Sequence, residues 1–347
     1  MKKQRISSLT GLKVVSLLCV FWGHCHSVYK PFDLGARSCE LLLLLSGFLM
    51  LHNYEKNDGN SVVEQQLTNV KKKIIQFYPL HILTFLFRIL FMYNNEGKKG
   101  ILLNLLLLHA WSSELRVYFS LNGLTWYLSV LLFCYFLAPV FINVHDKINK
   151  RHCIYFESVC LFLVFVCRTL FEVLNTNMNL GFVVHTFPPI RALDFFMGVE
   201  IGYMYEILKD RIKAGTLFFS IIEICISILI VFLCVVYDEI WPRWLFTLLM
   251  CPILFVYAIN KGIVSRIIST QPFILFSRIQ FEFYMIHQII IVFIGKRYLE
   301  GNMDFYLIML IVFVISIIIS IALKRVNKAL SPKFALLMNK TFDFIFE

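Results

Sequence analysis

Residues 11–29 read GLKVVSLLCVFWGHCHSVY, an apolar run that is long enough to cross the roughly 30 Å hydrocarbon core of a bilayer as one helix. The run nevertheless contains a lysine near its start, Lys13, and a histidine near its end, His24. At about 100° per residue, a helix brings both side chains to nearly the same face, about 16 Å apart along its axis. Because ionisable groups are costly inside a membrane, this pair is expected to serve function.

The composition of the whole chain indicates the same environment. Of the 347 residues, 59% are hydrophobic and 16% aromatic, and the mean hydropathy is +0.74. These values lie far outside the range of soluble proteins, so we expect an all-α integral membrane protein. Ten segments are long enough, or nearly so, to span the membrane as helices: 10–29, 38–54, 74–94, 122–143, 153–173, 187–207, 216–236, 243–260, 272–294 and 304–324. A further apolar run at 101–111 is too short to span and is predicted to be a re-entrant or interfacial helix.

The basic residues predict the orientation of these segments. With both termini in the cytoplasm, the ten-span topology places most of the 33 Lys and Arg residues on the cytoplasmic side, as the positive-inside rule requires. The net charge of +11 is then mainly a consequence of topology, with some attraction to anionic lipid, and nucleic-acid binding is not expected. We predict a single transmembrane domain over 1–347 in the plasma or inner cell membrane, with a basic tail at 325–347 along its inner surface.

Ionisable residues inside the predicted spans fall at two depths, and each is a candidate for a functional site. In the ten-span topology, the groups in the outer half of the membrane are His24, Glu40, Arg191, Asp194 and His287. The groups at the cytoplasmic mouth are basic, namely Lys13, Lys71, Lys72 and Lys73. A basic inner mouth below an acid–base cluster fits an anionic cytoplasmic donor with a long arm, and acyl-coenzyme A has this shape.

The chemistry of such a donor assigns roles to the outer groups. His24 would act as the general base that takes a proton from an acceptor hydroxyl. Glu40 would orient the imidazole, and Arg191 would stabilise the developing oxyanion. Structural alternatives remain open: Glu40 as a cap of the second helix, His287 as a partner of Glu282, and Lys13 as an ordinary positive-inside residue.

Five short motifs follow one another along the chain. They are SLTGLK at 8–13 with His24, ELLLLLSGFL at 40–49, NGLTWYLS at 122–129, PIR at 189–191 followed by Phe196 and Gly198, and FEFYMIH at 281–287. In this order and with ten predicted spans, they resemble the motifs of the membrane-bound acyltransferase-3 family. Members of that family acylate extracytoplasmic carbohydrates with a cytoplasmic acyl-CoA donor.

The resemblance implies an O-acetyltransferase that moves acetyl from acetyl-CoA to a hydroxyl of a surface polysaccharide, such as a capsule or exopolysaccharide, or of its lipid-linked precursor. The partners it implies are the acyl-CoA donor, a carbohydrate acceptor and the lipid bilayer, and a homodimer remains open. It implies the following site: catalytic His24, Glu40, Arg191 and His287; donor-binding Lys13, Lys71, Lys72, Lys73 and Gln76; and a substrate channel with Ser46, Trp126, Glu282 and Tyr284.

The chain departs from the family pattern in three places. Gln76 replaces an arginine of the third-span motif, leucines replace the aromatic residues before Ser46, and Leu131 replaces an acidic residue. These changes concern the pocket and the donor more than the reaction, because a lost arginine removes bidentate phosphate binding. Two rival readings are a transporter or flippase that uses the buried His, Glu and Arg as a relay, and a non-catalytic member of the fold. The ten cysteines show no metal-ligand spacing, so neither a disulfide nor a metal site is expected.

Overall fold

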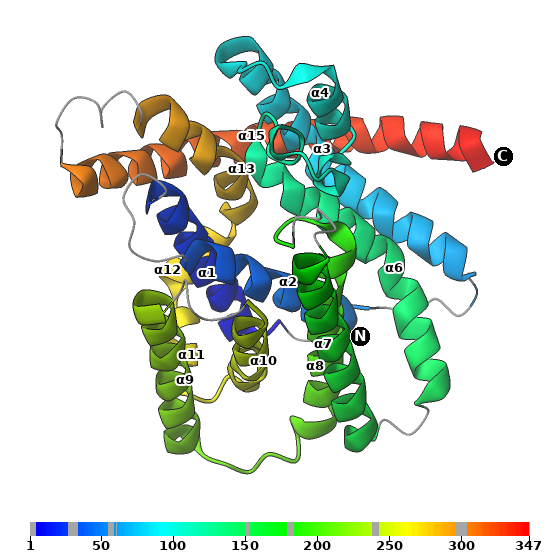
Figure 1. The fold of residues 1–347 in the computed structure, drawn as a ribbon, viewed down its shortest axis with the longest axis vertical. Helices are drawn as coiled ribbons and strands as arrows, with labels where there is room; N and C mark the ends of the chain where they lie inside the picture. Colours follow the sequence, from blue (N-terminus) through cyan, green and yellow to red (C-terminus); the bar gives the residue numbers. More distant parts are fainter. Residues whose placement is uncertain are drawn as a thin grey trace. The chain divides into compact units, whose positions relative to one another are not determined.

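The computed structural model of the protein describes residues 5–26, 34–54, 59, 61–149, 153–178, 184–237, 243–295 and 304–346. These residues form helices and no strands (Figure 1). The long helices are α1 (Ser7–His26), α2 (Leu34–His52), α3 (Val62–Met92), α6 (Trp126–Ile148), α7 (Ile154–Asn177), α8 (Pro188–Leu208), α9 (Thr216–Tyr237), α10 (Arg243–Ile259) and α15 (Phe305–Phe346). The short elements are α4 (Gly97–Leu105), η1 (His109–Trp111), α5 (Leu115–Tyr118), η2 (Gly123–Thr125), α11 (Ile263–Ile268), α12 (Gln271–Ser277), α13 (Gln280–Ile290) and the π-helix η3 (Ile291–Gly295).

Seven helices among the described residues are long and apolar enough to cross a membrane. They are Ser7–Cys25, Gly35–His52, Val62–Met92, Gly123–Ile148, Ile154–Asn177, Thr216–Cys234 and Phe305–Lys340. The other three predicted spans coincide with α8, which carries several charged residues, and with α10 and α13, which are shorter. The multi-pass helical architecture is thus confirmed, while the count of ten spans stays a prediction. Residues 27–29 of the first predicted span lie outside the described residues.

Contacts group the helices into two compact units, the first of which contains residues 1–58, 140–185 and 189–278. At its centre α1 packs against α2, α10, α11 and α12. Helix α2 also packs against α10, and α9 packs against α10 and α11. Helix α1 is therefore surrounded by other helices, and this explains how it accommodates polar side chains.

Glycines let α2 and α8 approach until their backbones touch. A Cβ atom added to Gly47 would lie 1.8 Å from the carbonyl oxygen of Phe195, and one added to Gly198 would lie 1.9 Å from the carbonyl oxygen of Leu44. Gly47 follows Glu40, and Gly198 follows Arg191, by about two helical turns. The crossing therefore turns the faces that carry these two charged residues toward each other.

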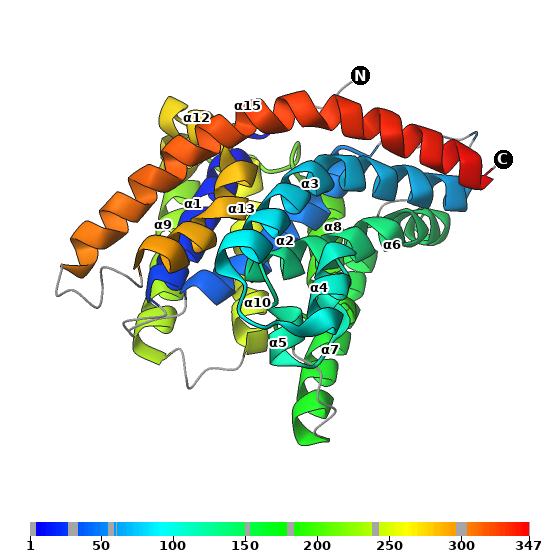
Figure 2. The same cartoon turned by 90° about the horizontal axis from the view of Figure 1, so that it is seen from above.

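The second unit contains residues 59–139, 186–188 and 279–347. Helix α3 starts with a capping box, in which the Ser61 hydroxyl accepts from the backbone N–H of Glu64 and the Glu64 carboxylate accepts from that of Ser61. Helix α15 packs along α13 and α3 (Figure 2). It continues without interruption for 42 residues, so the expected basic tail is the second half of this helix.

The short helix predicted at 101–111 is displaced toward the N-terminus, where it forms α4. Leu107 then adopts a left-handed conformation with a φ of 55°, which ends the helical path. A polar residue within the apolar run explains the change of direction. Asn104 is fully buried and donates to the carbonyl oxygen of Ser120 at 2.8 Å and to the hydroxyl of Thr125 at 3.3 Å. These bonds hold the segment that leads into α6.

The α2–α8 crossing provides a test of the fold. We expect Gly198→Ala to lower the free energy of unfolding by about 1–3 kcal/mol or more. The added methyl group would overlap the backbone of Leu44, which cannot shift without moving α2. Gly215→Ala is the matched control, since nothing lies within 4 Å of a Cβ added there. Thermal unfolding in detergent, followed by size-exclusion chromatography, measures the difference. Equal melting temperatures for the two variants would contradict the close approach.

Candidate active site

Four fully buried charged residues form a network in the first unit. The guanidinium of Arg191 on α8 lies 2.6 Å from Asp194 of the same helix and 3.6 Å from Glu40 on α2. Arg168 on α7 reaches the same two carboxylates, with Nε 3.2 Å from Asp194 and Nη2 3.9 Å from Glu40. The network joins three helices, and none of its four side chains is more than 1% exposed.

The charges of this network balance. Arg37 lies 3.9 Å from Glu40, and Glu172 forms a close ion pair with Arg168, so three guanidinium groups meet three carboxylates. The Thr247 hydroxyl adds a hydrogen bond of 3.3 Å to Glu40. Balance matters here because an unpaired charge in a low-dielectric interior costs several kcal/mol.

Besides Nη1 of Arg37, two guanidinium nitrogens of the network make no hydrogen bond within the described residues. Nη2 of Arg168 and Nη2 of Arg191 are buried and have no hydrogen-bond acceptor in the described part of the chain. Guanidinium N–H groups bind planar oxyanions well, because their donors are fixed in a fork. The arginine pair can therefore accept an anionic or strongly polar oxygen without giving up its ion pairs.

Glu40 is neither a helix cap nor a partner of His24. Helix α2 begins at Leu34, so Glu40 lies more than one turn inside it, where the network holds it. Its hydrogen bonds and ion pairs within the described residues go to the arginines and to Thr247. The expected orientation of the His24 imidazole by Glu40 is therefore not seen.

The depth of Glu40 also differs from the expectation. Gly23, next to His24, lies against Gly35 of α2, where an added Cβ would be 2.9 Å from the Gly35 Cα. Glu40 follows Gly35 by about 7.5 Å along α2, and the end of α1 lies against the start of α2. Glu40 is consequently nearer to the middle of α1 than to His24, so the two residues do not share one level.

Lys13 and His24 keep the relation that their spacing predicts. Both belong to the continuous helix α1 and both are partly buried. Lys13 has no hydrogen-bond or ion-pair partner among the described residues. A partly buried ammonium group without a counter-charge is unusual, because burial favours pairing. This group is therefore free to bind an anion.

In the second unit, the NGLTWYLS and FEFYMIH motifs pack against each other. Asn122 donates to the carbonyl oxygen of Met285 at 2.9 Å, and the Tyr284 hydroxyl donates to the carbonyl oxygen of Leu124 in a short bond. The rings of Tyr127 and Tyr284 lie 5.8 Å apart. Trp126 is buried in the same region, with 4% of its surface exposed. Two of the four expected channel residues thus lie in one cluster.

His287 is fully buried and is held by its own helix. Its Nδ1 lies 3.0 Å from the carbonyl oxygen of Phe283, and its ring stacks on the Phe283 ring at 5.5 Å. When Nδ1 donates to this carbonyl, Nε2 carries the lone pair. Glu282 instead accepts a hydrogen bond of 3.2 Å from Asn327 on α15. Glu282 thus has a partner on α15, and the alternative that His287 is a partner of Glu282 stays a prediction.

The other expected residues occupy less distinctive places. Lys73 donates to the exposed Gln76 at 3.2 Å and lies 4.1 Å from the ring centre of Tyr135. Lys71 is partly buried, and Lys72 is exposed. Ser46 donates to the carbonyl oxygen of Leu42 at 2.7 Å within its own helix, which is typical of a packed helical serine.

Some polar groups were not expected from the sequence. Asp194 and Arg168 complete the ion network; the sequence places Asp194 at the depth of Arg191 and pairs Arg168 with Glu172, but it does not predict that the two groups meet. In the second unit, His109 places its Nε2 3.2 Å from the Thr125 hydroxyl. Burial lowers the pKa of His109 to about 3, so this imidazole is neutral at physiological pH.

Comparison with known proteins supports the motif assignment. The acyltransferase-3 family model, described as an acyltransferase domain, matches residues 6–325 of the 347-residue chain. No curated protein and no solved structure matches the chain. The family match covers nearly the whole chain and includes all five motifs, and the chain therefore belongs to the acyltransferase-3 family of membrane acyltransferases.

Proposed function

We propose that this acyltransferase takes acetyl from cytoplasmic acetyl-CoA and transfers it to a hydroxyl of an extracytoplasmic polysaccharide or lipid-linked glycan. The proposal includes ten spans with both termini in the cytoplasm of a cell-membrane protein. Family membership supports the acyl-transfer chemistry. The charge distribution of the chain supports the direction of transfer, from a basic inner side to the outer side.

The observation that carries the proposal is the combination of Lys13 and His24 on α1. Lys13 lacks any counter-charge among the described residues, and a phosphate of coenzyme A would supply one. The pantetheine arm would then extend along α1 toward His24, about 16 Å away. One helix would thus bind the donor at one end and hold the catalytic base near the other.

The proposed reaction uses His24 as a general base. The imidazole accepts the proton of the acceptor hydroxyl while the hydroxyl oxygen attacks the thioester carbonyl carbon. The tetrahedral intermediate then collapses, the carbon–sulfur bond breaks, and the imidazolium returns the proton to the coenzyme A thiolate. The Nη2 groups of Arg168 and Arg191, next to Glu40, would donate hydrogen bonds to the negative charge that develops on the carbonyl oxygen.

The remaining expected residues receive supporting roles. Lys71, Lys72 and Lys73 would add positive charge for the donor phosphates, with Gln76 as an uncharged neighbour. We keep His287 as a proposed catalytic residue, in the role of a second polar group for the acceptor. The other residues would shape the substrate channel, namely Ser46, Trp126, Glu282 and Tyr284.

The central test is the substitution of His24. We expect His24→Ala to reduce transfer of radiolabelled acetyl from acetyl-CoA to glycan by about 100- to 10,000-fold, because general-base catalysis contributes that much. The control is Ser16→Ala on the same helix, where the hydroxyl bonds only the preceding turn. Folding of both variants is checked by size-exclusion chromatography in detergent. Full activity of a folded His24→Ala protein would remove the proposed base.

The donor site has a separate test. We expect Lys13→Gln to weaken acetyl-CoA binding by about tenfold or more, since a charge-assisted hydrogen bond contributes about 1.5–3 kcal/mol. Calorimetric titration of the purified protein with acetyl-CoA measures the Kd. Lys99→Gln is the control, because Lys99 is exposed, pairs with Glu114 and lies far from Lys13 in the sequence. If both variants bind acetyl-CoA like the wild type, the donor does not use Lys13.

A further inference from the structure

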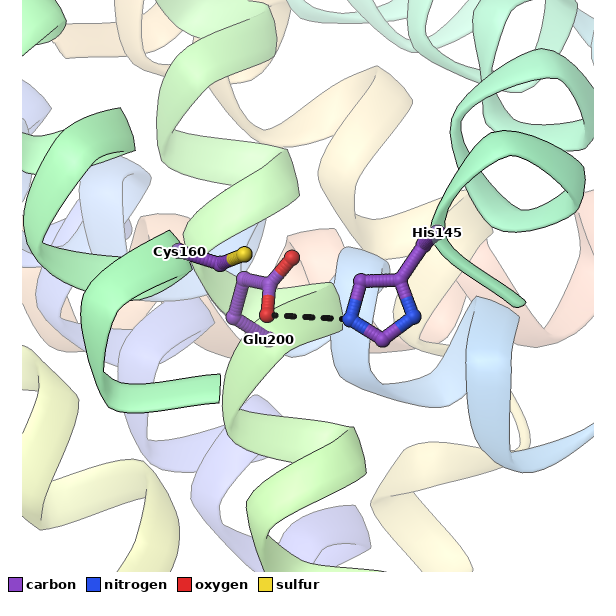
Figure 3. A group of neighbouring side chains, drawn as sticks. All are labelled: His145, Cys160 and Glu200. Atoms are coloured by element: carbon purple, nitrogen blue, oxygen red, sulfur yellow. Dashed lines mark ion pairs between the residues drawn. The ribbon is translucent and has the colours of Figure 1, made fainter. Parts of the chain in front are cut away.

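Three helices bring together His145, Cys160 and Glu200, all of which are residues of the first unit. These residues come from α6, α7 and α8, and their side chains point toward one another (Figure 3). The imidazole nitrogen, the thiol sulfur and the carboxylate oxygen all lie within 4.8 Å of one another. A second carboxylate joins them, because Glu157 Oε2 lies 2.8 Å from His145 Nε2.

The cluster buries more negative than positive charge. Glu157 and Glu200 are both fully buried, and His145 is their only cationic partner in the described part of the chain. Asp146, which faces the other imidazole nitrogen at 3.9 Å, adds a further carboxylate. With both glutamates ionised, the group carries net negative charge even when the imidazole is protonated. A buried carboxylate in such a place calls for a cation.

Glu200 shows where that cation is missing. Glu157 is satisfied, since Asn149 donates to its Oε1 at 2.7 Å and His145 bonds its Oε2. Both oxygens of Glu200, by contrast, are buried and have no hydrogen-bond partner among the residues that the structure describes. The nearest donor recorded for them is His145 Nε2 at 3.6 Å, which is too long for a hydrogen bond. An unsatisfied buried carboxylate that faces an imidazole and a thiol is the arrangement of an incomplete metal site.

We propose that His145, Glu157, Cys160 and Glu200 bind a divalent transition-metal ion of the zinc class. One nitrogen, one sulfur and two carboxylate oxygens suit zinc, whereas calcium and magnesium prefer oxygen alone. Binding breaks the hydrogen bond between His145 Nε2 and Glu157: a neutral imidazole moves its Nε2 proton to Nδ1, an imidazolium releases it, and the Cys160 thiol releases its own proton. Three ligand atoms already lie together, and when Glu157 Oε2 turns from the imidazole to the ion as the fourth ligand, no position stays open and the ion is structural rather than catalytic.

The surroundings of the cluster hold its ligands in place. The His145 ring stacks on Tyr203, with ring centres 3.9 Å apart and planes 15° apart. Tyr203 donates to Asp146 at 2.7 Å, and Asn149 fixes Glu157. Such second contacts set the orientation of metal-binding imidazoles and carboxylates. The sequence did not reveal the site, because its residues come from separate helices and follow no short spacing.

The ion would link the helices that supply the buried ion network. Cys160 precedes Arg168 on α7, and Glu200 follows Asp194 on α8. A metal bond between these two helices fixes their rotation relative to each other. The site therefore supports the geometry of the arginine pair without touching the substrate.

The test measures metal in the purified full-length protein. After exposure to zinc and removal of free metal, we expect zinc in an amount equimolar with the protein, measured by elemental mass spectrometry. Cys160→Ser and Glu200→Gln should lose this zinc. Cys167→Ser should keep it, because Cys167 lies on the same helix but is exposed and outside the cluster.

Cobalt provides a second readout, because its absorption band can be measured on the wild-type protein itself before any variant is compared. Cobalt added to the wild-type protein should produce the near-ultraviolet thiolate-to-metal absorption band, and this band should be absent from folded Cys160→Ser but present in Cys167→Ser. A wild-type protein that binds neither metal would overturn the proposal. Zinc and cobalt binding that is unchanged in folded Cys160→Ser and Glu200→Gln would overturn it as well.

Discussion

The pairing of buried charges is the constraint on which the first unit depends. Arg168 and Arg191 are held by Glu40 and Asp194 at a depth where side chains have almost no contact with solvent. Removing one partner from such a set leaves an uncompensated charge, which typically costs about 3–5 kcal/mol. Helices α2, α7 and α8 must therefore pack together for their charges to pair. The glycine contact between α2 and α8 brings these charges within reach of one another.

Local signals in the sequence predict much of this architecture. The length of the apolar runs predicts the helices, because a bilayer requires about 20 residues per span. Gly47 and Gly198 belong to two of the five motifs, and both lie at the α2–α8 crossing, where small residues let membrane helices approach. The order of the five motifs predicts the family, because the motifs come from several helices along nearly the whole chain.

The relations between helices could not be predicted in the same way. The sequence places Glu40 and His24 in neighbouring spans, but their relative depth depends on the contact between Gly23 and Gly35. The helix predicted at 101–111 shifts because the buried amide of Asn104 needs partners that lie later in the chain. The group around Glu200 likewise forms only when α6, α7 and α8 meet. Each of these features depends on contacts between segments that are distant in the sequence, and no periodic pattern within one segment predicts such contacts.

The length of α15 sets a geometric condition on the membrane-facing part of the protein. At 1.5 Å per residue, its 42 residues extend about 63 Å, roughly twice the thickness of the hydrocarbon core. Because a helix of this length is unbroken, its two halves tilt together. Any change in the tilt of the apolar half, for instance in a thinner bilayer, moves the basic half by a comparable angle relative to the lipid headgroups.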